Sequence, residues 1–193
     1  RDTFSATSIA SNLKYLGYDK VLAVSRLQDI PNILEAIKLV RSKDAAFLFM
    51  GAGVMKECIQ EFISKHKELN VAFLGEINAE NKSEALSACD IAIVSLSKGM
   101  KGLGVPSKAY FSMAADKPLL VVSDDGSELV RVVKDLDIGW FCKSEAPVSL
   151  AGIIDDICEV DLSERKGRAQ AVFKEKFSDD ISLGKISCVL KGL

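Results

Sequence analysis

Six apolar runs of strand length alternate with amphipathic stretches along this chain, and this alternation limits the possible folds more than any other feature. The runs cover residues 20–25, 45–50, 70–75, 90–96, 118–123 and 138–142. Their apolar residues are nearly continuous, which is typical of strands that are covered on both faces. Because a crossover segment separates each run from the next, the pattern predicts an α/β fold with a six-stranded, doubly wound parallel sheet. Right-handed crossovers should place helices on both faces.

Helical periodicity fills the intervals between these runs. Ile33, Ile37 and Val40 fall at helical spacing, for example, in the first interval. The intervals predict helices at 32–42, 54–68, 82–89, 107–115 and 127–136, with a short lead-in helix at 5–17 and three further helices at 146–158, 162–177 and 179–193. We therefore expect a helical lead-in at 1–19, a sheet domain at 20–158 and additional C-terminal helices at 159–193.

Composition excludes several classes of function. A net charge of −2 over 193 residues gives no reason to expect a nucleic-acid partner. Five scattered cysteines without a CxxC pair indicate reduced thiols in a cytoplasmic protein, and we expect no metal. The one histidine, His66, lies among charged residues and suits a solvated helix better than a catalytic site. No apolar run reaches membrane-spanning length, and the missing initiator methionine suggests a fragment or a processed chain.

The loops that follow the strands should carry the function, because ligands of such sheets bind beyond the carboxyl ends of the strands where the strand order reverses. Arg26 follows the first strand, and Gly126, Ser127 and Glu128 open the helix after the fifth. After the fourth strand comes a long glycine-rich and lysine-rich loop that ends at Ser107, which we expect to cap the next helix.

Glycines and lysines at the start of a helix suit an anion. Free N–H groups and the helix dipole attract negative charge there, and glycine lets the ligand approach the backbone. The candidate binding residues are therefore Arg26, Lys101, Gly102, Leu103, Gly104, Ser107, Lys108, Gly126, Ser127 and Glu128. Neither a P-loop nor a dinucleotide fingerprint is present. Plainer interpretations remain: Arg26 pairs with Asp29, Lys101 is a solvated loop residue, and Glu128 only stabilises its helix.

The order of segments resembles a known family. The succession MGAGVMKECI, NVAFLGEI, ALSACDIAIVSL, GLGVPSKAYFSMAADKPLLVVSDDGSELVRVV and IGWF, from about residue 20 to 142, is similar to the Rossmann-like, carboxyl-terminal half of GT-B glycosyltransferases. It looks like family 4, in the bacterial surface-polysaccharide branch that carries a PSK segment.

The resemblance implies a site for a nucleotide diphosphate sugar, with no other cofactor. Arg26 matches an arginine that binds the diphosphate in that family, but the accompanying lysine falls near Pro31 or Asn32. Two family glutamates are also absent, since Lys101 stands at the first position and Ala109 or Phe111 at the second, depending on the alignment. Lys108 can replace the lysine, and Glu128 can reach the sugar or a ribose hydroxyl.

Two functions remain open from the sequence. The first is the donor-binding half of a glycosyltransferase in capsule, O-antigen or other polysaccharide synthesis, which passes a glycosyl group to a glycan or lipid-linked acceptor held by an absent N-terminal half. That parent enzyme would be cytoplasmic, at the inner face of the membrane through peripheral association. The second is a non-catalytic module that binds a nucleotide, a sugar phosphate or a protein. No nucleophile or general base can be named.

Overall fold

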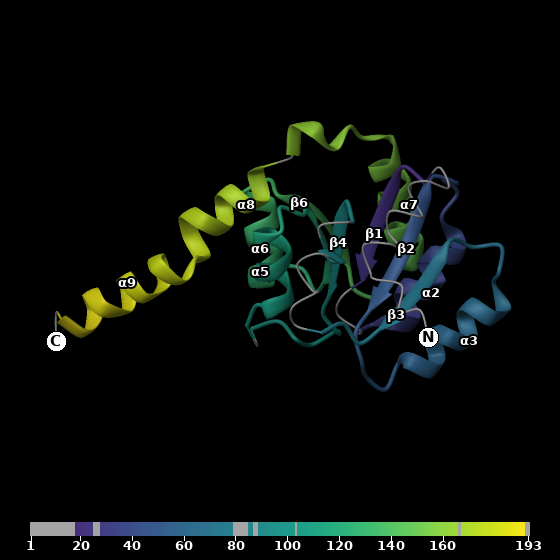
Figure 1. Ribbon diagram of the computed structural model, residues 1–193, viewed down its shortest axis with the longest axis horizontal. Helices are drawn as coiled ribbons and strands as arrows, with labels where there is room; N and C mark the ends of the chain where they lie inside the picture. The colour runs from purple at the N-terminus through teal and green to yellow at the C-terminus, as the bar shows by residue number, and fades with distance from the viewer. Residues whose placement is uncertain are drawn as a thin grey trace.

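The computed structural model describes residues 18–24, 28–78, 85–86, 89–102, 104–165 and 167–191 of the chain. Its elements, in chain order, are β1 (Lys20–Val24), α2 (Ile30–Leu39), β2 (Ala45–Met50), α3 (Lys56–Lys65), β3 (Val71–Gly75), β4 (Ile91–Ser95), α5 (Ser107–Ala114), β5 (Leu119–Ser123), α6 (Glu128–Asp135), β6 (Gly139–Lys143), α7 (Pro147–Glu159), the 3-10 turn η2 (Leu162–Arg165), α8 (Arg168–Val172), the π-helical turn η3 (Phe173–Phe177) and α9 (Asp179–Lys191). Figure 1 shows their arrangement.

The six strands form one parallel sheet in the order β3-β2-β1-β4-β5-β6. Leu22 of β1 pairs with Phe47 of β2 on one side and with Ile91 of β4 on the other, so β1 lies in the middle of the sheet. The predicted doubly wound α/β sheet is confirmed, and each strand lies within one residue of its apolar run. The strand order reverses between β1 and β4.

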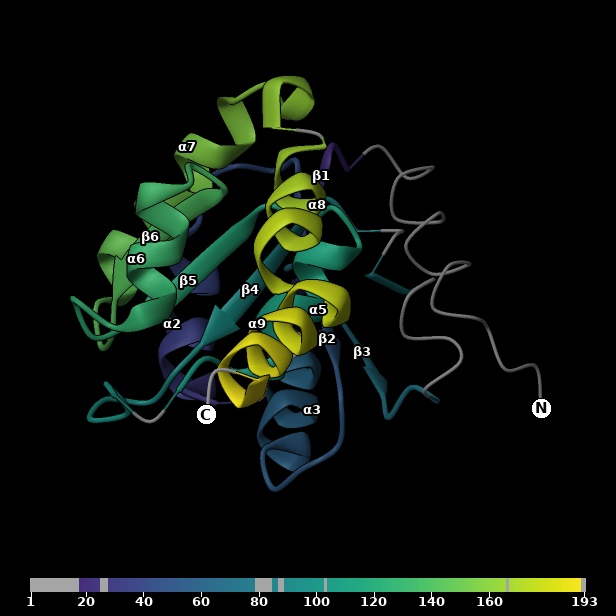
Figure 2. The same ribbon diagram turned by 90° about the vertical axis from the view of Figure 1, so that its left-hand side faces the viewer.

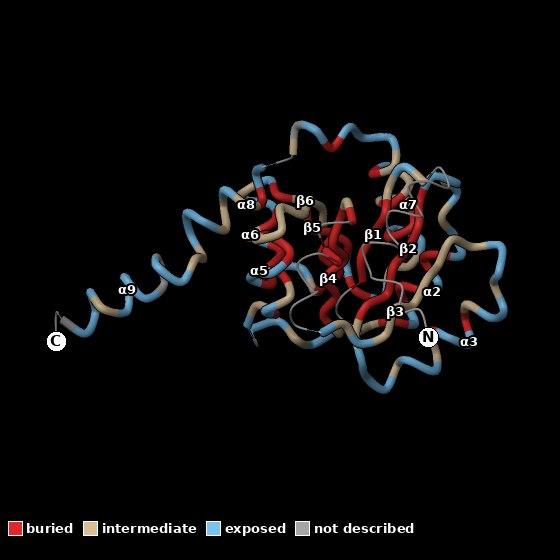
Figure 3. Tube along the Cα trace, viewed as in Figure 1, coloured by how far each residue is buried: buried red, intermediate tan, exposed pale blue. Residues whose placement is uncertain are grey.

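Successive residues of each central strand face opposite sides of the sheet, which explains the continuous apolar runs. Leu22 and Val24 pack against one group of helices, α2, α3 and α7. Val21 and Ala23 pack on the other side, against the buried residues at 85–86 and Cys89. Next to them on that side, α5, α6 and α8 cover β4 and β5, and α8 lies beside α5 (Figure 2). The buried residues are concentrated in the sheet (Figure 3).

The C-terminal segment departs from the sequence prediction. A single helix over 162–177 is wrong, because Gly167 takes a left-handed backbone conformation (φ 80°) and separates η2 from α8. The final helix α9 extends away from the body of the molecule (Figure 1). The expected helix at 5–17 lies outside the described residues, as does most of the one at 82–89. Of that second helix, residues 85–86 are described and are helical.

Candidate functional site

The loops after β1 and β4 begin at the same edge of the sheet, on the two sides of the reversal in strand order. Such a reversal separates the two loops and leaves room for a ligand beyond the strand ends. The Ser95 hydroxyl, at the end of β4, donates to the carbonyl of Gln28 at 2.5 Å and joins the two loops at their base. Arg26 lies outside the described residues, so the structure does not place it.

Three glycines shape the β4–α5 loop, and the described backbone of this loop is open to solvent. Gly99, Gly102 and Gly104 have φ angles of 83°, 84° and 95°, which side chains disfavour. An added Cβ at each would meet no atom within 4 Å. These glycines therefore serve the backbone conformation rather than close packing. Leu103 between them lies outside the described residues.

The helix α5 starts one residue earlier than a cap at Ser107 would require. Its N-cap is Pro106, in extended conformation, which makes no side-chain capping hydrogen bond to the first turn of α5. Ser107 is instead the first helical residue and is exposed, so the predicted serine cap is wrong. Because Pro106 has the extended conformation of an N-cap, the helix begins at residue 107 rather than at residue 108. Lys108 follows, half-buried, in the first turn.

The turn between β5 and α6 is held by its own side chains. The Ser127 hydroxyl caps α6 by accepting from the N–H of Val130 at 3.4 Å, as its place at the helix start suggests. The Ser123 hydroxyl donates to that of Ser127 at 3.0 Å, and both residues are buried. The Asp125 carboxylate accepts from the N–H of Gly126 at 2.9 Å. This turn is consequently rigid.

Lys101 crosses from the β4–α5 loop to this turn. Its ammonium nitrogen lies 3.0 Å from the point where a Cβ on Gly126 would stand. Gly126 also has a φ of 72°. Two loops that were predicted separately therefore meet, and glycine at 126 suits the positive φ of the turn, while a Cβ there would displace the Lys101 ammonium only slightly.

Glu128 is exposed at the first position of α6. Burial raises the pKa of Tyr110 on α5, and the Glu128 carboxylate raises it further, so Glu128 lies near α5. The starts of α5 and α6 thus lie close together. They bring Lys101, Lys108, Gly126 and Glu128 to one part of the sheet edge.

Two more contacts hold the β4–α5 loop, and the sequence did not indicate either of them. The N–H of Gly99 donates to a carboxylate oxygen of Asp124 at 2.7 Å. The Lys98 ammonium pairs with Glu145 in the β6–α7 loop at 2.7 Å, and this carboxylate raises the pKa of Lys98. Both contacts span long sequence separations, which no local pattern reveals.

The β1–α2 side of the edge contributes a half-buried carboxyl group, that of Asp29. Burial raises the pKa of Asp29; a hydrogen bond from Asn32 lowers it, and the Glu145 carboxylate raises it again. The Asn32 amide nitrogen donates to Asp29 at 3.0 Å, while its buried oxygen has no hydrogen-bond partner among the described residues.

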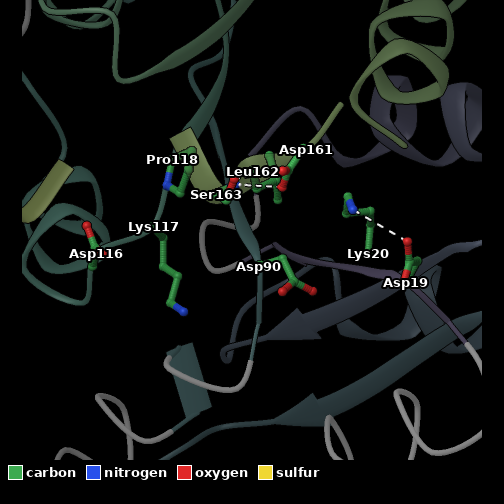
Figure 4. A pocket seen from close by; sticks show the side chains of 9 residues that line it. All are labelled: Asp19, Lys20, Asp90, Asp116, Lys117, Pro118, Asp161, Leu162 and Ser163. Atoms are coloured by element: carbon green, nitrogen blue, oxygen red, sulfur yellow. Dashed lines mark hydrogen bonds and ion pairs between the residues drawn. The ribbon is translucent and has the colours of Figure 1, made fainter. Parts of the chain in front are cut away.

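A pocket of about 300 Å³ lies at the opposite edge, at the amino ends of β1, β4 and β5 (Figure 4). Its polar side chains serve the fold. The carboxylate of Asp90 accepts from the N–H of Val21 at 2.8 Å, and Asp116 accepts from the N–H groups of Gly167 and Gln170. Asp161 accepts from the Ser163 hydroxyl at 2.7 Å. We assign this pocket a structural role.

Within the described residues, no cluster of three His, Cys, Asp or Glu side chains is arranged to hold a metal ion. The described helices include none with the length and apolarity to span a bilayer. His66 ends α3, contacts the Phe62 ring at 4.6 Å between centroids and lies 3.3 Å from Glu68, so it is only half-exposed.

Comparison with known proteins gives consistent results. The family model for glycosyl transferases group 1 matches residues 5–172. A probable glycosyltransferase of Pseudomonas aeruginosa, WbjE, is 44% identical over 170 residues, which are 88% of this chain and 42% of WbjE. This chain thus spans about two fifths of that relative's length.

Solved structures agree on the fold. A glycosyltransferase of Rickettsia africae superposes with a TM-score of 0.75 at 15% identity, over 97% of this chain and 51% of that one. Anabaena Alr3699/HepE, solved in complex with UDP and glucose, gives 0.72 at 16% identity, over 99% and 54%. At these identities the likeness shows the GT-B half as a fold and nothing further.

Proposed function

The chain belongs to the group 1 glycosyl transferases, and from this premise we propose that it is the donor-binding half of an enzyme that transfers a glycosyl group from a nucleotide diphosphate sugar. The observation that carries the proposal is the convergence of the uncapped start of α5, the open glycine backbone and Lys101 at the α6 turn. A helix start with free N–H groups, adjacent to cations, is suited to a diphosphate. The non-catalytic alternative is not favoured, because the family and the relative are both glycosyltransferases.

In this proposal the diphosphate oxygens accept from the backbone N–H groups of Gly102, Gly104 and Ser107. Lys101 and Lys108 supply charge, and Arg26 approaches from the β1 side. As the bond between the glycosyl carbon and the phosphate oxygen breaks, negative charge grows on the departing diphosphate. Donors fixed before the reaction stabilise that charge without reorganisation. Because these groups belong to the chain, the proposal requires no metal or other cofactor.

Glu128 is proposed to bind the sugar or ribose hydroxyls of the donor. It is exposed, lies near α5 and stands at the same edge as the lysines. Phe111, which one alignment puts at a family glutamate position, is 59% exposed on α5. Its ring has no oxygen or nitrogen atom to accept a hydrogen bond from a sugar hydroxyl. The Glu128 carboxylate is therefore the better candidate for this contact.

The acceptor is proposed to bind to a part of the protein beyond this chain, since the relative is more than twice as long. The helix α9 supports this view. It exposes Leu183, Ile186, Val189 and Leu190 by 56% to 66%, and it projects from the body (Figure 1). We propose that α9 docks on the other half of the protein. The 193-residue chain should then bind more of an apolar dye than a longer protein that includes that half, and equal binding would reject the docking.

The finer assignments are also proposals: family 4, synthesis of capsule, O-antigen or another surface polysaccharide, a glycan or lipid-linked acceptor, and a cytoplasmic site at the inner face of the membrane. The five cysteines are free thiols, which suits a reducing compartment. Cosedimentation of the whole protein with anionic lipid vesicles tests the membrane association.

The first experiment is thermal unfolding of the chain with UDP, GDP, ADP and CMP, alone and as sugar conjugates. A nucleotide at about a hundred times its Kd adds roughly 2.7 kcal/mol, or about 5 to 11 °C for a chain of this size. We expect one diphosphate nucleotide to give this shift, and Lys108→Ala and Arg26→Ala to reduce it.

Lys67→Ala is the matched control, because Lys67 is exposed in the turn between α3 and β3 at the opposite edge. It should leave the shift unchanged. Absence of a shift with every nucleotide would reject the donor site, and glycosyl transfer by the whole protein then tests the activity itself. Unchanged affinity after Glu128→Ala would reject the hydroxyl contact.

A further inference from the structure

We propose that Asp124 is a positioning residue, which holds the β4–α5 loop in the conformation that binds the donor diphosphate. This inference rests on the proposed function. Asp124 contacts the loop rather than the donor, so its effect on donor binding passes through Gly99.

The contact joins the conformationally permissive backbone of Gly99 to the side chain of Asp124. The Asp124 carboxylate accepts from the N–H of Gly99 at 2.7 Å, a charge-assisted hydrogen bond of short length. Gly99 itself is exposed, and its φ of 83° is one of many conformations open to glycine. The bond therefore selects one loop conformation from many.

Asp124 is itself anchored. Its backbone carbonyl accepts from the N–H of Ser127 at 3.3 Å, and the preceding residue, Ser123, is a buried member of β5. Ser127 is buried and caps α6. The carboxylate therefore projects from a turn that backbone and side-chain hydrogen bonds hold in place.

The β4–α5 loop has other contacts as well. The Lys98–Glu145 pair is 68% and 59% exposed, and exposed ion pairs contribute little. Lys101 lies over Gly126, but its ammonium is needed for the diphosphate in the proposed function. The bond between Asp124 and Gly99 ties the loop to the β5–α6 turn through a side chain that the proposed function does not assign to the diphosphate.

An ordered loop binds the donor more tightly because the ordering has already occurred in the free protein. Gly102, Gly104 and Ser107 follow Gly99 within eight residues along the chain. Loss of the anchor should thus weaken diphosphate binding even though Asp124 is negative. In the opposite role, the carboxylate would occupy a phosphate position and compete with the donor. The two roles predict opposite signs for the same variant.

The experiment is isothermal titration of the wild-type chain and of Asp124→Ala with the nucleoside diphosphate that binds the wild type, with amide hydrogen exchange at Gly99. We expect Asp124→Ala to bind about three- to tenfold more weakly and the Gly99 amide to exchange faster. Asp124→Asn, which keeps an acceptor oxygen, should recover part of the affinity. A loss of stability of the whole fold would instead speed the exchange of buried amides as well as that of Gly99.

Asp135→Asn is the matched control, because it removes the same charge from the exposed last residue of α6, at the end of that helix away from this turn. It should bind within about twofold of the wild type. Equal or tighter binding by Asp124→Ala, an unchanged Gly99 exchange rate or an equal loss in Asp135→Asn would overturn the positioning role. Failure of every nucleotide to bind the wild type would instead reject the proposed function.

Discussion

Gly139 of β6 is the glycine whose replacement should cost the fold most. A Cβ at this position would overlap the carbonyl oxygen of Leu119 in β5 and lie 2.7 Å from the carbonyl carbon and the amide nitrogen of the same residue. All three atoms belong to the backbone, so no side-chain rotation relieves the overlap. The φ of Gly139 is not positive, so the constraint is the distance between the strands.

Alanine at 139 therefore has to push β6 away from β5. Leu119 pairs with Gly139, and its N–H donates to the carbonyl of Ile138 at 3.0 Å. Weakening about two such hydrogen bonds costs roughly 1 kcal/mol each, and overpacking adds about 1 kcal/mol or more. A loss of about 3 kcal/mol lowers the Tm by roughly 6 to 12 °C in a chain of this size.

The assay is thermal unfolding followed by circular dichroism, with Gly152→Ala as the matched control. A Cβ at Gly152 in α7 would meet no atom within 4 Å. Alanine in a helix interior gains about 0.5 to 1 kcal/mol over glycine, so the control should melt slightly higher than the wild type. A Gly139→Ala variant that melts within about 1 °C of the wild type would refute the close approach of β6 to β5.

Three further predictions concern other parts of the fold. Burial raises the pKa of Asp155, but hydrogen bonds from Ser42 and Arg41 outweigh it and hold the pKa below 3.8. The ionised Asp155 therefore stabilises the fold above this pH, and the stabilisation is lost as the pH falls through the lowered pKa. Asp155→Asn should lower the Tm at pH 7, by an amount that shrinks in acid; a deficit independent of pH would contradict this. Arg165 lies over Trp140, the one tryptophan, at 4.7 Å from the ring centroid, so Arg165→Ala should shift its fluorescence emission to longer wavelength and cost about 0.5 to 1 kcal/mol; unchanged emission would argue against the stacking. Burial raises the pKa of Cys142 to about 11, so a thiol reagent at pH 8 should label exposed Cys188 first and Cys142 only on unfolding, as peptide mass mapping will show.

Much of the candidate site was visible in the sequence because it depends on local chemistry. Ser127 was expected to open α6 and does so, and Lys108 was expected in the first turn of α5. The cap at Ser107 was wrong because Pro106 directs the chain into the helix one residue earlier than a serine cap would. The single helix at 162–177 failed for an equally local reason, the left-handed conformation of Gly167, which the sequence permits but does not require.

The sequence by itself determined the strands, most helices and the edge of the sheet at which we propose the site. Apolar runs report burial on both faces, and successive parallel strands place all their carboxyl ends at the same edge. The sequence also carried the resemblance that the family model supports at the level of group 1 glycosyl transferases.

Only the tertiary structure decided which loops touch. The order β3-β2-β1-β4-β5-β6 sets the reversal between β1 and β4, and sheet packing brings Gly99 to Asp124, Lys98 to Glu145 and Lys101 to Gly126. Each of these contacts joins residues 25 or more positions apart. Local patterns do not encode such pairs, because their energy depends on distances that are fixed only when the whole sheet has assembled.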